Sequence, residues 1–243
     1  MQVVLLAAGL GSRLGALTEK LPKALIEVAG QTLLARAVRF AGRLAPSEIV
    51  VVGGFCFSDV AAEVSRLPLA VTLVENRDFR DGNLVSLLAA RARIDGDFVL
   101  MNVDHIYRPA VAPLVAEAVQ SVTAFVDRDR ALGADDMKVL RDGQGRVREI
   151  AKTLTQFDCG YVGMTRVPAR DVDRYWTAAD AVITSEGRAV HVERILARLA
   201  ASEAPDERPA CRDISGIGWL EVDLRDEREY ADAVVRAAPS EWN

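Results

Sequence analysis

Long apolar runs and cysteines are both scarce in this sequence. No stretch of the 243 residues reaches the roughly 18 consecutive apolar residues that a membrane-spanning helix needs. The N-terminus is typical of a strand and lacks a charged segment followed by a signal-type apolar run. The three cysteines, Cys56, Cys159 and Cys211, show neither metal-ligand spacing nor a disulfide framework. We therefore expect a cytoplasmic protein with reduced thiols and no stable membrane insertion.

Positive charge and aromatic residues are also in short supply. The 30 Lys and Arg against 35 Asp and Glu give a net charge of −5, which argues against nucleic-acid binding because that function favours a basic face. The aromatic residues are 7 Phe, 4 Tyr and 3 Trp, too few to favour a cage around a quaternary ammonium. Half of the residues are hydrophobic, so a sizeable core is available to one large α/β domain or two small ones.

A glycine-rich turn follows the first apolar segment. The run Val3–Ala7 is typical of a buried strand and breaks at Gly9–Leu14, which reads Gly-Leu-Gly-Ser-Arg-Leu. Glycines let a backbone approach a phosphate, and Arg13 and Lys23 add the fixed positive charge that suits a triphosphate and a departing pyrophosphate. The segment matches neither the dinucleotide fingerprint nor the P-loop pattern. The alternative is a plain strand-turn-helix connection with two turn glycines.

The stretch from Leu6 to Leu34 resembles the nucleotidyltransferases that activate sugar phosphates and phospho-alcohols with a nucleoside triphosphate. The matching segments are Ala7-Ala8-Gly9-x-Gly11-x-Arg13-Leu14, Pro22-Lys23-Ala24-Leu25 and Val28-x-Gly30-x-x-Leu33-Leu34. The resemblance implies a Rossmann-like three-layer α/β sandwich with a mixed, mostly parallel sheet. It also implies Arg13 and Lys23 as catalytic residues. The expected nucleotide-binding residues are Leu6, Ala7, Ala8, Gly9, Gly11, Ser12, Arg13, Asn76, Gly82, Asn83 and Ser86.

Strand and helix patterns alternate along the first hundred residues. Strands are expected at 49–52, 70–74 and 98–101, and helices at 31–44, 59–67 and 84–94. This order predicts a mostly parallel sheet whose ligands lie beyond the carboxyl ends of the strands, where Gly9, Asn76 and Asp104 fall. We expect one domain over the whole chain, with a nucleotide half at about 1–110 and an acceptor half at about 111–243.

A polar loop at 75–83 opens the helix expected at 84–94. Gly82 would let the backbone approach a nucleobase, while Asn83 and Ser86 would meet phosphate or base at the helix N-terminus. Alternatively, Asn83 or Ser86 simply caps that helix. The order Asn76, Gly82-Asn83, Ser86 is similar to the corresponding loop of cytidylyltransferases that act on inositol phosphate and phosphocholine.

Three carboxylates are candidates for a metal site. Asp104 follows a buried strand, and Glu221 and Asp223 alternate so that both are expected to face the same side of a strand. Mg²⁺ is commonly held by one or two carboxylates together with substrate phosphates. The segment Trp-x-Glu-x-Asp resembles the second metal-binding segment of these transferases. The alternatives are a turn at Asp104 and an exposed polar strand face at Glu221 and Asp223. We expect His105 to be structural, because an ionised phosphate needs no general base.

The second half of the chain carries fewer motifs. A strand is expected at 122–126, a hairpin at 136–140 and 146–150, helices at 171–182, 190–201 and 226–237, and loops at 127–130 and 202–212. The block 136–163 is similar to the acceptor half of the same cytidylyltransferases, which implies that Lys152, with Asp104, binds the acceptor phosphate. Lys138 is the second choice because it could merely face solvent. Trp176 and His191 are expected to be packing or rim residues.

The resemblance therefore implies a Mg²⁺-dependent enzyme that joins a nucleoside triphosphate, CTP by preference, to a phospho-alcohol such as inositol 1-phosphate and releases pyrophosphate. Three alternatives remain. They are a sugar-1-phosphate nucleotidyltransferase using GTP, UTP or dTTP, a phosphocholine or phosphonate cytidylyltransferase, and a regulatory protein that binds nucleotide without catalysis. A nucleotide-sugar glycosyltransferase is disfavoured because Asn102-Val103-Asp104 stands in place of Asp-x-Asp. A homodimer is left open.

Overall fold

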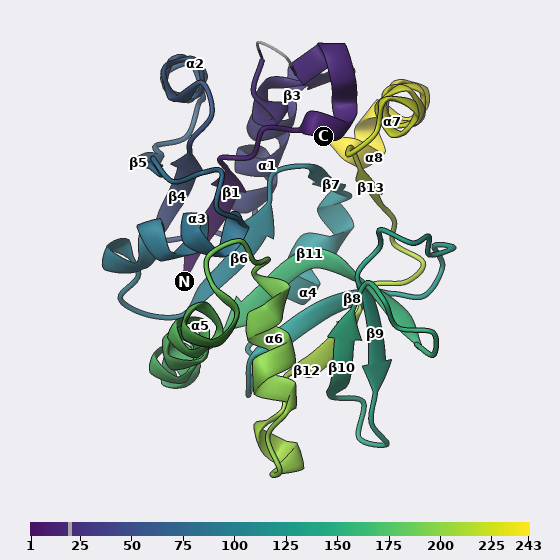
Figure 1. Cartoon of the computed structure of the whole chain (residues 1–243). Helices are drawn as coiled ribbons and strands as arrows, with labels where there is room; N and C mark the ends of the chain where they lie inside the picture. The colour runs from purple at the N-terminus through teal and green to yellow at the C-terminus, as the bar shows by residue number, and fades with distance from the viewer. Residues whose placement is uncertain (19–20) are drawn as a thin grey trace.

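The computed structural model describes residues 1–18 and 21–243 as a central sheet with helices on both faces (Figure 1). The strands are β1 (Gln2–Ala7), β2 (Glu27–Val28), β3 (Gln31–Thr32), β4 (Glu48–Gly53), β5 (Thr72–Glu75), β6 (Phe98–Asn102), β7 (His105–Tyr107), β8 (Thr123–Asp127), β9 (Lys138–Arg141), β10 (Val147–Ala151), β11 (Cys159–Val167), β12 (Ala210–Asp213) and β13 (Trp219–Glu221). The α-helices are α1 (Leu33–Gly42), α2 (Phe57–Val64), α3 (Asn83–Ala90), α4 (Ala112–Ala116), α5 (Val172–Glu186), α6 (Glu193–Ala200), α7 (Arg225–Ala237) and α8 (Pro239–Trp242).

The main sheet is mixed, with the order β10-β9-β11-β6-β1-β4-β5, and β8 pairs with both β11 and β12. Strands β6, β1, β4 and β5 run parallel, whereas β11 runs antiparallel to β6, β8 and β9. The carboxyl ends of β1 and β6 lie side by side, with Leu6 opposite Asn102. The Rossmann-like fold class predicted from the sequence is therefore confirmed.

Strand β1 is apolar along its whole length because both of its faces are buried. Val4 and Leu6 belong to the core under α3, α5 and α6, whereas Val3 and Leu5 belong to the core under α1 and α4. Successive side chains of a strand point to opposite faces, so a continuous apolar run fills two layers of core at once. The result is a three-layer sandwich.

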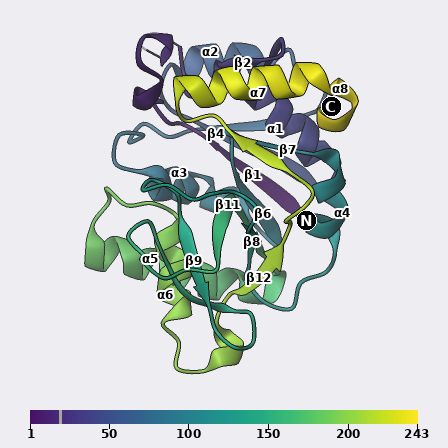
Figure 2. The same cartoon turned by 90° about the vertical axis from the view of Figure 1, so that its right-hand side faces the viewer.

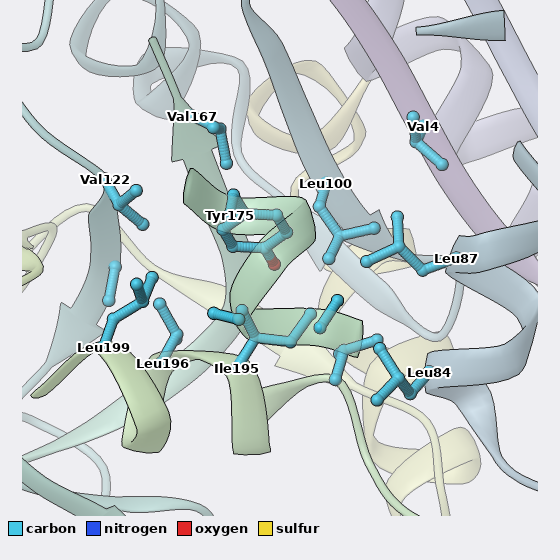
Figure 3. Close-up of a cluster of buried hydrophobic side chains, with 14 of the residues drawn as sticks. Val4, Leu84, Leu87, Leu100, Val122, Val167, Tyr175, Ile195, Leu196 and Leu199 are labelled. Atoms are coloured by element: carbon cyan, nitrogen blue, oxygen red, sulfur yellow. The ribbon is translucent and has the colours of Figure 1, made fainter. Parts of the chain in front are cut away.

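The core on the α3, α5 and α6 side joins the two halves of the chain. In Figure 3, Leu84 and Leu87 of α3 lie beside Leu100 of β6, and Ile195 of α6 lies beneath Tyr175 of α5. All of these side chains are at most 1 % exposed. The start of α6 is thereby fixed against the same sheet that carries the glycine-rich turn.

Most predicted elements are present within a few residues of their expected ends. Helix α1 begins later than expected because Gln31 and Thr32 pair as β3, and the Thr32 hydroxyl accepts a hydrogen bond from the N–H of Ala35 at 3.0 Å. Such a hydroxyl satisfies one of the unpaired N–H groups of a first helical turn. Other helix and strand ends differ from the expected ones by a few residues.

Two strands of the main sheet were not predicted. Residues 159–167 form β11 at the centre of the antiparallel region, and residues 210–213 form β12 where a loop was expected. Strand β11 is buried on both faces although it contains Thr165 and Arg166, so it shows neither alternation nor an apolar run. Strand β12 pairs with β8 and carries Arg212 and Asp213, which resemble a charged loop in the sequence.

The C-terminal segment returns to the N-terminal part of the molecule. Figure 2 shows α7 beside β2, and α7 contacts both β2 and the segment 12–18. The N–H of Ala29 donates to Asp232 of α7 at 2.8 Å, and Arg36 of α1 reaches Asn243. This return brings β13 and the residues after it to the glycine-rich turn. Within the described residues, no helix is long and apolar enough to cross a membrane.

Candidate active site

Two adjoining cavities form one cleft at the carboxyl ends of β1 and β6. The glycine-loop cavity has a volume of about 330 Å³ and is lined by residues 6–13, Lys23 and the start of α3. The Lys152 cavity, of about 220 Å³, is lined by Lys152 and by residues of β11, α6 and β13. The residues that line both are Arg13, Asn83, Asn102, Asp104, His191 and Asp223.

The Lys23 ammonium lies where the two cavities meet. Its Nζ donates to Oδ2 of Asp104 at 2.5 Å and to Oδ1 of Asp223 at 2.6 Å. Gly11, with φ +67°, makes this position accessible, because a Cβ on residue 11 would lie 2.9 Å from Cβ of Lys23. Burial opposes the charged form, but the carboxylates of Asp104 and Asp223 raise the pKa of Lys23 above 10.5. The site therefore holds a permanent cation between two carboxylates from distant segments.

Arg13 belongs to the same cluster. Its guanidinium pairs with Asp223 and lies 3.8 Å from Asp135, and its side chain is 43 % exposed at the mouth of the cleft. Both cations predicted to be catalytic thus meet at Asp223.

His105 holds Asp104 from the opposite side. Its Nδ1 lies 2.6 Å from Oδ1 of Asp104, and its ring stacks on Trp219 with centroids 5.2 Å apart. Burial opposes protonation, but the carboxylate of Asp104 raises the pKa of His105 above 6.5. Burial likewise opposes ionisation of Asp104, yet Lys23 and His105 lower the pKa of that carboxyl far below its usual range. His105 orients Asp104, in line with the structural role expected for it.

Strand β11 bends to make room for His105. Gly163 has φ +70°, and a Cβ there would lie 2.7 Å from Nε2 of His105. The β11–β8 register shifts between Tyr161 and Thr165, around this glycine. A single left-handed residue thus lets an antiparallel strand pass over the imidazole.

Two of the three carboxylates predicted to bind a metal ion lie together in the cleft. Asp104 and Asp223 already converge on one cation, the Lys23 ammonium, and their hard oxygen atoms fit a divalent cation that is also bound by phosphates. Glu221 does not converge with them. Within residues 1–18 and 21–243, no group of three or more Asp, Glu, His or Cys is arranged to hold a metal ion. In this structure Glu221 pairs with Arg130 rather than with Lys23, and the three-carboxylate metal site stays a prediction.

Glu221 is directed elsewhere because β13 ends at Glu221, so that Asp223 lies in the turn beyond it. The carboxylate of Glu221 accepts a hydrogen bond from Nη1 of Arg130 at 2.8 Å, and Arg130 also pairs with Glu227 at 3.2 Å. The Arg130 guanidinium lies over the ring of Trp219, 5.0 Å from its centroid. The charge run 127–130 was expected to be a solvated loop. Its last residue, Arg130, instead holds Glu221 at the wall of the Lys152 cavity.

The polar residues of the 75–86 segment have mixed roles. The side-chain amide of Asn76 donates to the hydroxyl of Ser86 at 3.0 Å, and both residues are buried. Ser86 lines the glycine-loop cavity, whereas Asn76 lies behind it. Asn83 does not cap α3; its Oδ1 accepts from the N–H of Val192 at 2.8 Å and fixes the start of α6.

Gly82 lines the glycine-loop cavity but is also required for packing. Its φ is +137°, and a Cβ there would lie 2.5 Å from the carbonyl oxygen of Val190. The close approach visible in the structure is to the backbone before α6, and the approach to a nucleobase stays a prediction.

The two lysines considered for the acceptor phosphate differ clearly. Lys152 lines the cavity that bears its name. Lys138 is buried and donates to the carbonyl oxygens of Gly133 at 2.6 Å and of Lys152 at 2.8 Å. Lys138 thus neither faces solvent nor reaches the cavity, and it positions the backbone of Lys152.

Sequence reasoning missed several residues that line the cleft. Phe79 and Arg80 line the glycine-loop cavity, and His191 and Glu193 line the Lys152 cavity. Helix propensity and spacing do not distinguish such positions. His191 and Glu193 reach the site because residues 190–192 contact the start of α3.

A family model described as the MobA-like NTP transferase domain matches residues 3–167, which include the glycine-rich turn, Lys23, Asp104 and Lys152. The chain belongs to this family. The resemblance to nucleotidyltransferases predicted from the first 34 residues is thereby confirmed.

Curated relatives and solved structures give two further comparisons. The chain is 34 % identical over 235 residues to a bifunctional IPC transferase and DIPP synthase of Rubrobacter xylanophilus, and 28 % identical over 231 residues to the Aquifex aeolicus protein of that name. These matches cover 95 % and 94 % of this chain but 51 % and 50 % of the relatives, so the chain spans about half of their length.

Two solved structures share the fold across the whole chain. The inositol-1-phosphate CTP transferase from T. maritima superposes with a TM-score of 0.81 at 16 % identity and covers 96 % of each chain. The CTP:phosphocholine cytidylyltransferase from Streptococcus pneumoniae gives a TM-score of 0.77 at 17 % identity, covering 96 % of this chain and 98 % of that one. At these identities the likeness establishes the fold.

Proposed function

We propose that this chain is a nucleotidyltransferase that joins CTP to a phosphorylated polyol such as inositol 1-phosphate and releases pyrophosphate. The observation that carries the proposal is the Lys23 ammonium, held at 2.5 Å by Asp104 and at 2.6 Å by Asp223 between the glycine-rich turn and the Lys152 cavity. The choice of CTP and a polyol phosphate is supported by the names of the IPC transferase relatives and of the T. maritima protein.

The proposed reaction forms one P–O bond and breaks another. An oxygen of the acceptor phosphate attacks the α-phosphorus of CTP in line, and the bond from that phosphorus to the pyrophosphate breaks with its electron pair. The attacking phosphate is already ionised, so no general base has to remove a proton. Catalysis then rests on positioning and electrostatic stabilisation.

The roles of the residues follow from their places in the cleft. Arg13 and the backbone N–H groups of Gly9–Ser12 would hold the β- and γ-phosphates. Lys23 would stabilise the charge that builds up on the α-phosphate, and Lys152 would bind the acceptor phosphate. His105 would hold Asp104 in place through the 2.6 Å contact at Nδ1.

We propose Mg²⁺ as the cofactor, held by Asp104 and Asp223. When bound, it would neutralise phosphate charge and so assist attack at the α-phosphorus. Glu221 would act through Arg130 rather than as a ligand. The Lys23 ammonium, now shared by the two carboxylates, would then be available to phosphate oxygens.

The test is pyrophosphate release by the purified chain with Mg²⁺. Each of CTP, GTP, UTP and dTTP is combined with inositol 1-phosphate, phosphocholine, aminoethylphosphonate and sugar 1-phosphates. We expect release with CTP and inositol 1-phosphate. Release with another nucleotide and a sugar 1-phosphate would contradict both choices but keep the reaction type. Nucleotide binding without release from any pair would contradict the proposed reaction.

A further inference from the structure

One carboxylate in the Lys152 cavity differs from all the others. Glu193, the first residue of α6, lines this cavity and is 8 % exposed. In the part of the chain that the structure describes, its carboxylate has no ion pair and no hydrogen bond from another residue's side chain. The other carboxylates that line the cavity each have an ion pair; they are Asp104, Asp135, Asp136, Glu221, Asp223 and Glu227.

The position of Glu193 is fixed by its surroundings. Asn83 accepts a hydrogen bond from the N–H of Val192, and the N–H of Leu84 donates to the carbonyl oxygen of Val190 at 3.4 Å. Both contacts fix the segment before α6 to the start of α3. The same first turn of α6 is anchored by Ile195, which is fully buried. The carboxylate is therefore held at the cavity wall by rigid elements.

A buried carboxylate whose hydrogen-bond donor is its own backbone N–H is unfavourable for folding. Burial raises the pKa of Glu193 above its usual value of 4.5, and its own backbone N–H and the charges of His191 and Lys152 offset this only in part. Buried polar groups in proteins almost always have hydrogen-bond partners. A carboxylate that lines a cavity and receives no hydrogen bond from another described residue is suited to receive a further donor from a ligand.

The cavity favours a hydroxyl group as that donor. Of the Phe, Tyr and Trp residues, Tyr161 alone lines the Lys152 cavity among the described residues, and its hydroxyl is already 2.8 Å from the hydroxyl of Thr165. A quaternary ammonium is bound best by several aromatic faces. Lys152 supplies a cation for a phosphate in the same cavity. The combination of one cation and one unpaired carboxylate fits a phosphate on a hydroxylated ring.

We propose that Glu193 is a specificity-determining residue that accepts a hydrogen bond from a ring hydroxyl of a polyol phosphate acceptor whose phosphate is bound by Lys152. This inference rests on the proposed function and adds the group that recognises the acceptor. Glu193 touches no phosphate in this scheme, so its contribution is confined to acceptors that carry the hydroxyl.

The test compares two acceptors that differ only in their hydroxyls, inositol 1-phosphate and cyclohexyl phosphate. The second is measured as a substrate or, if it is not turned over, as a competitive inhibitor. We expect Glu193→Ala to lower kcat/KM for inositol 1-phosphate by about tenfold to a hundredfold, because a hydrogen bond to a charged group is lost. The constant for cyclohexyl phosphate should stay within about twofold. Glu193→Gln keeps an acceptor oxygen and should recover part of the loss.

The matched control is Glu186→Ala. Glu186 of α5 accepts hydrogen bonds from Arg194 of α6 at 2.7 and 2.8 Å, outside the cleft, so this variant loosens α6 without touching the cavity. This variant should leave the constants measured for both acceptors unchanged. The thermal midpoints of the two Glu193 variants should stay close to that of the wild type, because no ion pair and no hydrogen bond to another side chain is lost.

Several results would overturn the inference. An equal loss for both acceptors in Glu193→Ala would assign a structural role to Glu193. A preference of the wild type for aminoethylphosphonate that disappears in both Glu193→Ala and Glu193→Gln would identify an amine as the ligand group. Failure of the wild type to bind inositol 1-phosphate more tightly than cyclohexyl phosphate would also contradict it.

Calorimetric binding of the two phosphates separates this inference from the proposed function. If inositol 1-phosphate binds through Glu193 but is not turned over, the proposed reaction is wrong and the assignment of Glu193 stands. If turnover occurs and Glu193→Ala changes kcat/KM equally for the two phosphates, the proposed reaction stands and the assignment of Glu193 is wrong.

Discussion

The glycine-loop cavity and the Lys152 cavity share a wall but differ in how their charges are balanced. In the first, Arg13 and Lys23 are both paired with Asp223. In the second, Glu193 has no ion pair among the described residues. Arg13 and Lys23 in the first cavity are already paired within the protein, so a triphosphate must exchange partners with them. In the second cavity the Glu193 carboxylate is left for a ligand group to pair with. We therefore expect this cavity to determine which acceptor is bound.

The largest effect is expected when the Lys23 ammonium, which Asp104 and Asp223 share, is removed. We expect Lys23→Met to reduce kcat by at least about a hundredfold to a thousandfold, because the charge at the α-phosphate loses its stabilising donor. Steady-state pyrophosphate release measures the loss, and circular dichroism checks the fold. A near-normal rate would contradict the role of Lys23.

The matched control for that variant is the other buried lysine. Lys138→Met leaves the carbonyl oxygens of Gly133 and Lys152 without a donor, which should cost about 1–3 kcal/mol in the free energy of unfolding. It should retain most of kcat, with a raised KM for the acceptor. If Lys138→Met were as inactive as Lys23→Met, the distinction between a reacting and a structural lysine would fail.

The second prediction separates the carboxylates that the sequence treats alike. Asp223→Asn should reduce kcat by about a hundredfold or more, because it weakens the contacts to both Lys23 and Arg13 and removes a metal ligand. Glu221→Gln should reduce it by about tenfold or less, because Glu221 acts through Arg130. Titration of the rate with Mg²⁺ should show a raised Mg²⁺ requirement in Asp223→Asn alone. A reversed order of the two variants would restore the predicted three-carboxylate site.

A third prediction concerns the Lys152 cavity. Lys152→Ala should raise KM for the acceptor about tenfold to a hundredfold and leave KM for CTP unchanged, since Lys152 lines this cavity and not the glycine-loop cavity. Initial rates with each substrate varied in turn give both constants. An equal rise in the two KM values would mean that the cavities do not bind separate substrates.

The smallest expected effect is on stability rather than on chemistry. Gly163→Ala should lower the free energy of unfolding by about 2–4 kcal/mol, because a Cβ is unfavourable both for the left-handed backbone and for the contact with His105. Gly145→Ala has a similar φ of +75° but no atom within 4 Å, so it should cost about 1 kcal/mol. Denaturant unfolding of the pair isolates the contact with His105. Equal losses of unfolding free energy in the two variants would mean that β11 moves away from His105 without a loss of stability.

The sequence allows much of the first cavity to be predicted because its residues follow the ends of parallel strands. Gly9, Lys23 and Asp104 stand in or just after recognisable patterns, and the structure brings Lys23 and Asp104 into contact. Asp223 was also identified from its segment. Its contact with Lys23 could not be predicted, because it depends on the return of α7 to β2 and to the segment 12–18.

The second cavity was harder to predict because its walls come from an antiparallel strand and a helix start. Strand β11 mixes polar and apolar residues on two buried faces, so its sequence lacks a period. Glu193 begins an ordinary amphipathic helix, and only the contacts of Asn83 and Gly82 with the preceding loop bring it to the cleft. Arg130 belongs to a charge run that resembles a solvated loop, and its contact with Glu221 spans 91 residues.

The central claim, that the acceptor phosphate attacks the α-phosphorus of CTP, is tested most directly by ³¹P NMR with inositol 1-phosphate labelled with ¹⁸O on its phosphate. We predict pyrophosphate and a product with two coupled phosphorus signals, in which ¹⁸O occupies the bridge between the two phosphorus atoms. Release of CMP or orthophosphate without a bridged product would contradict the account.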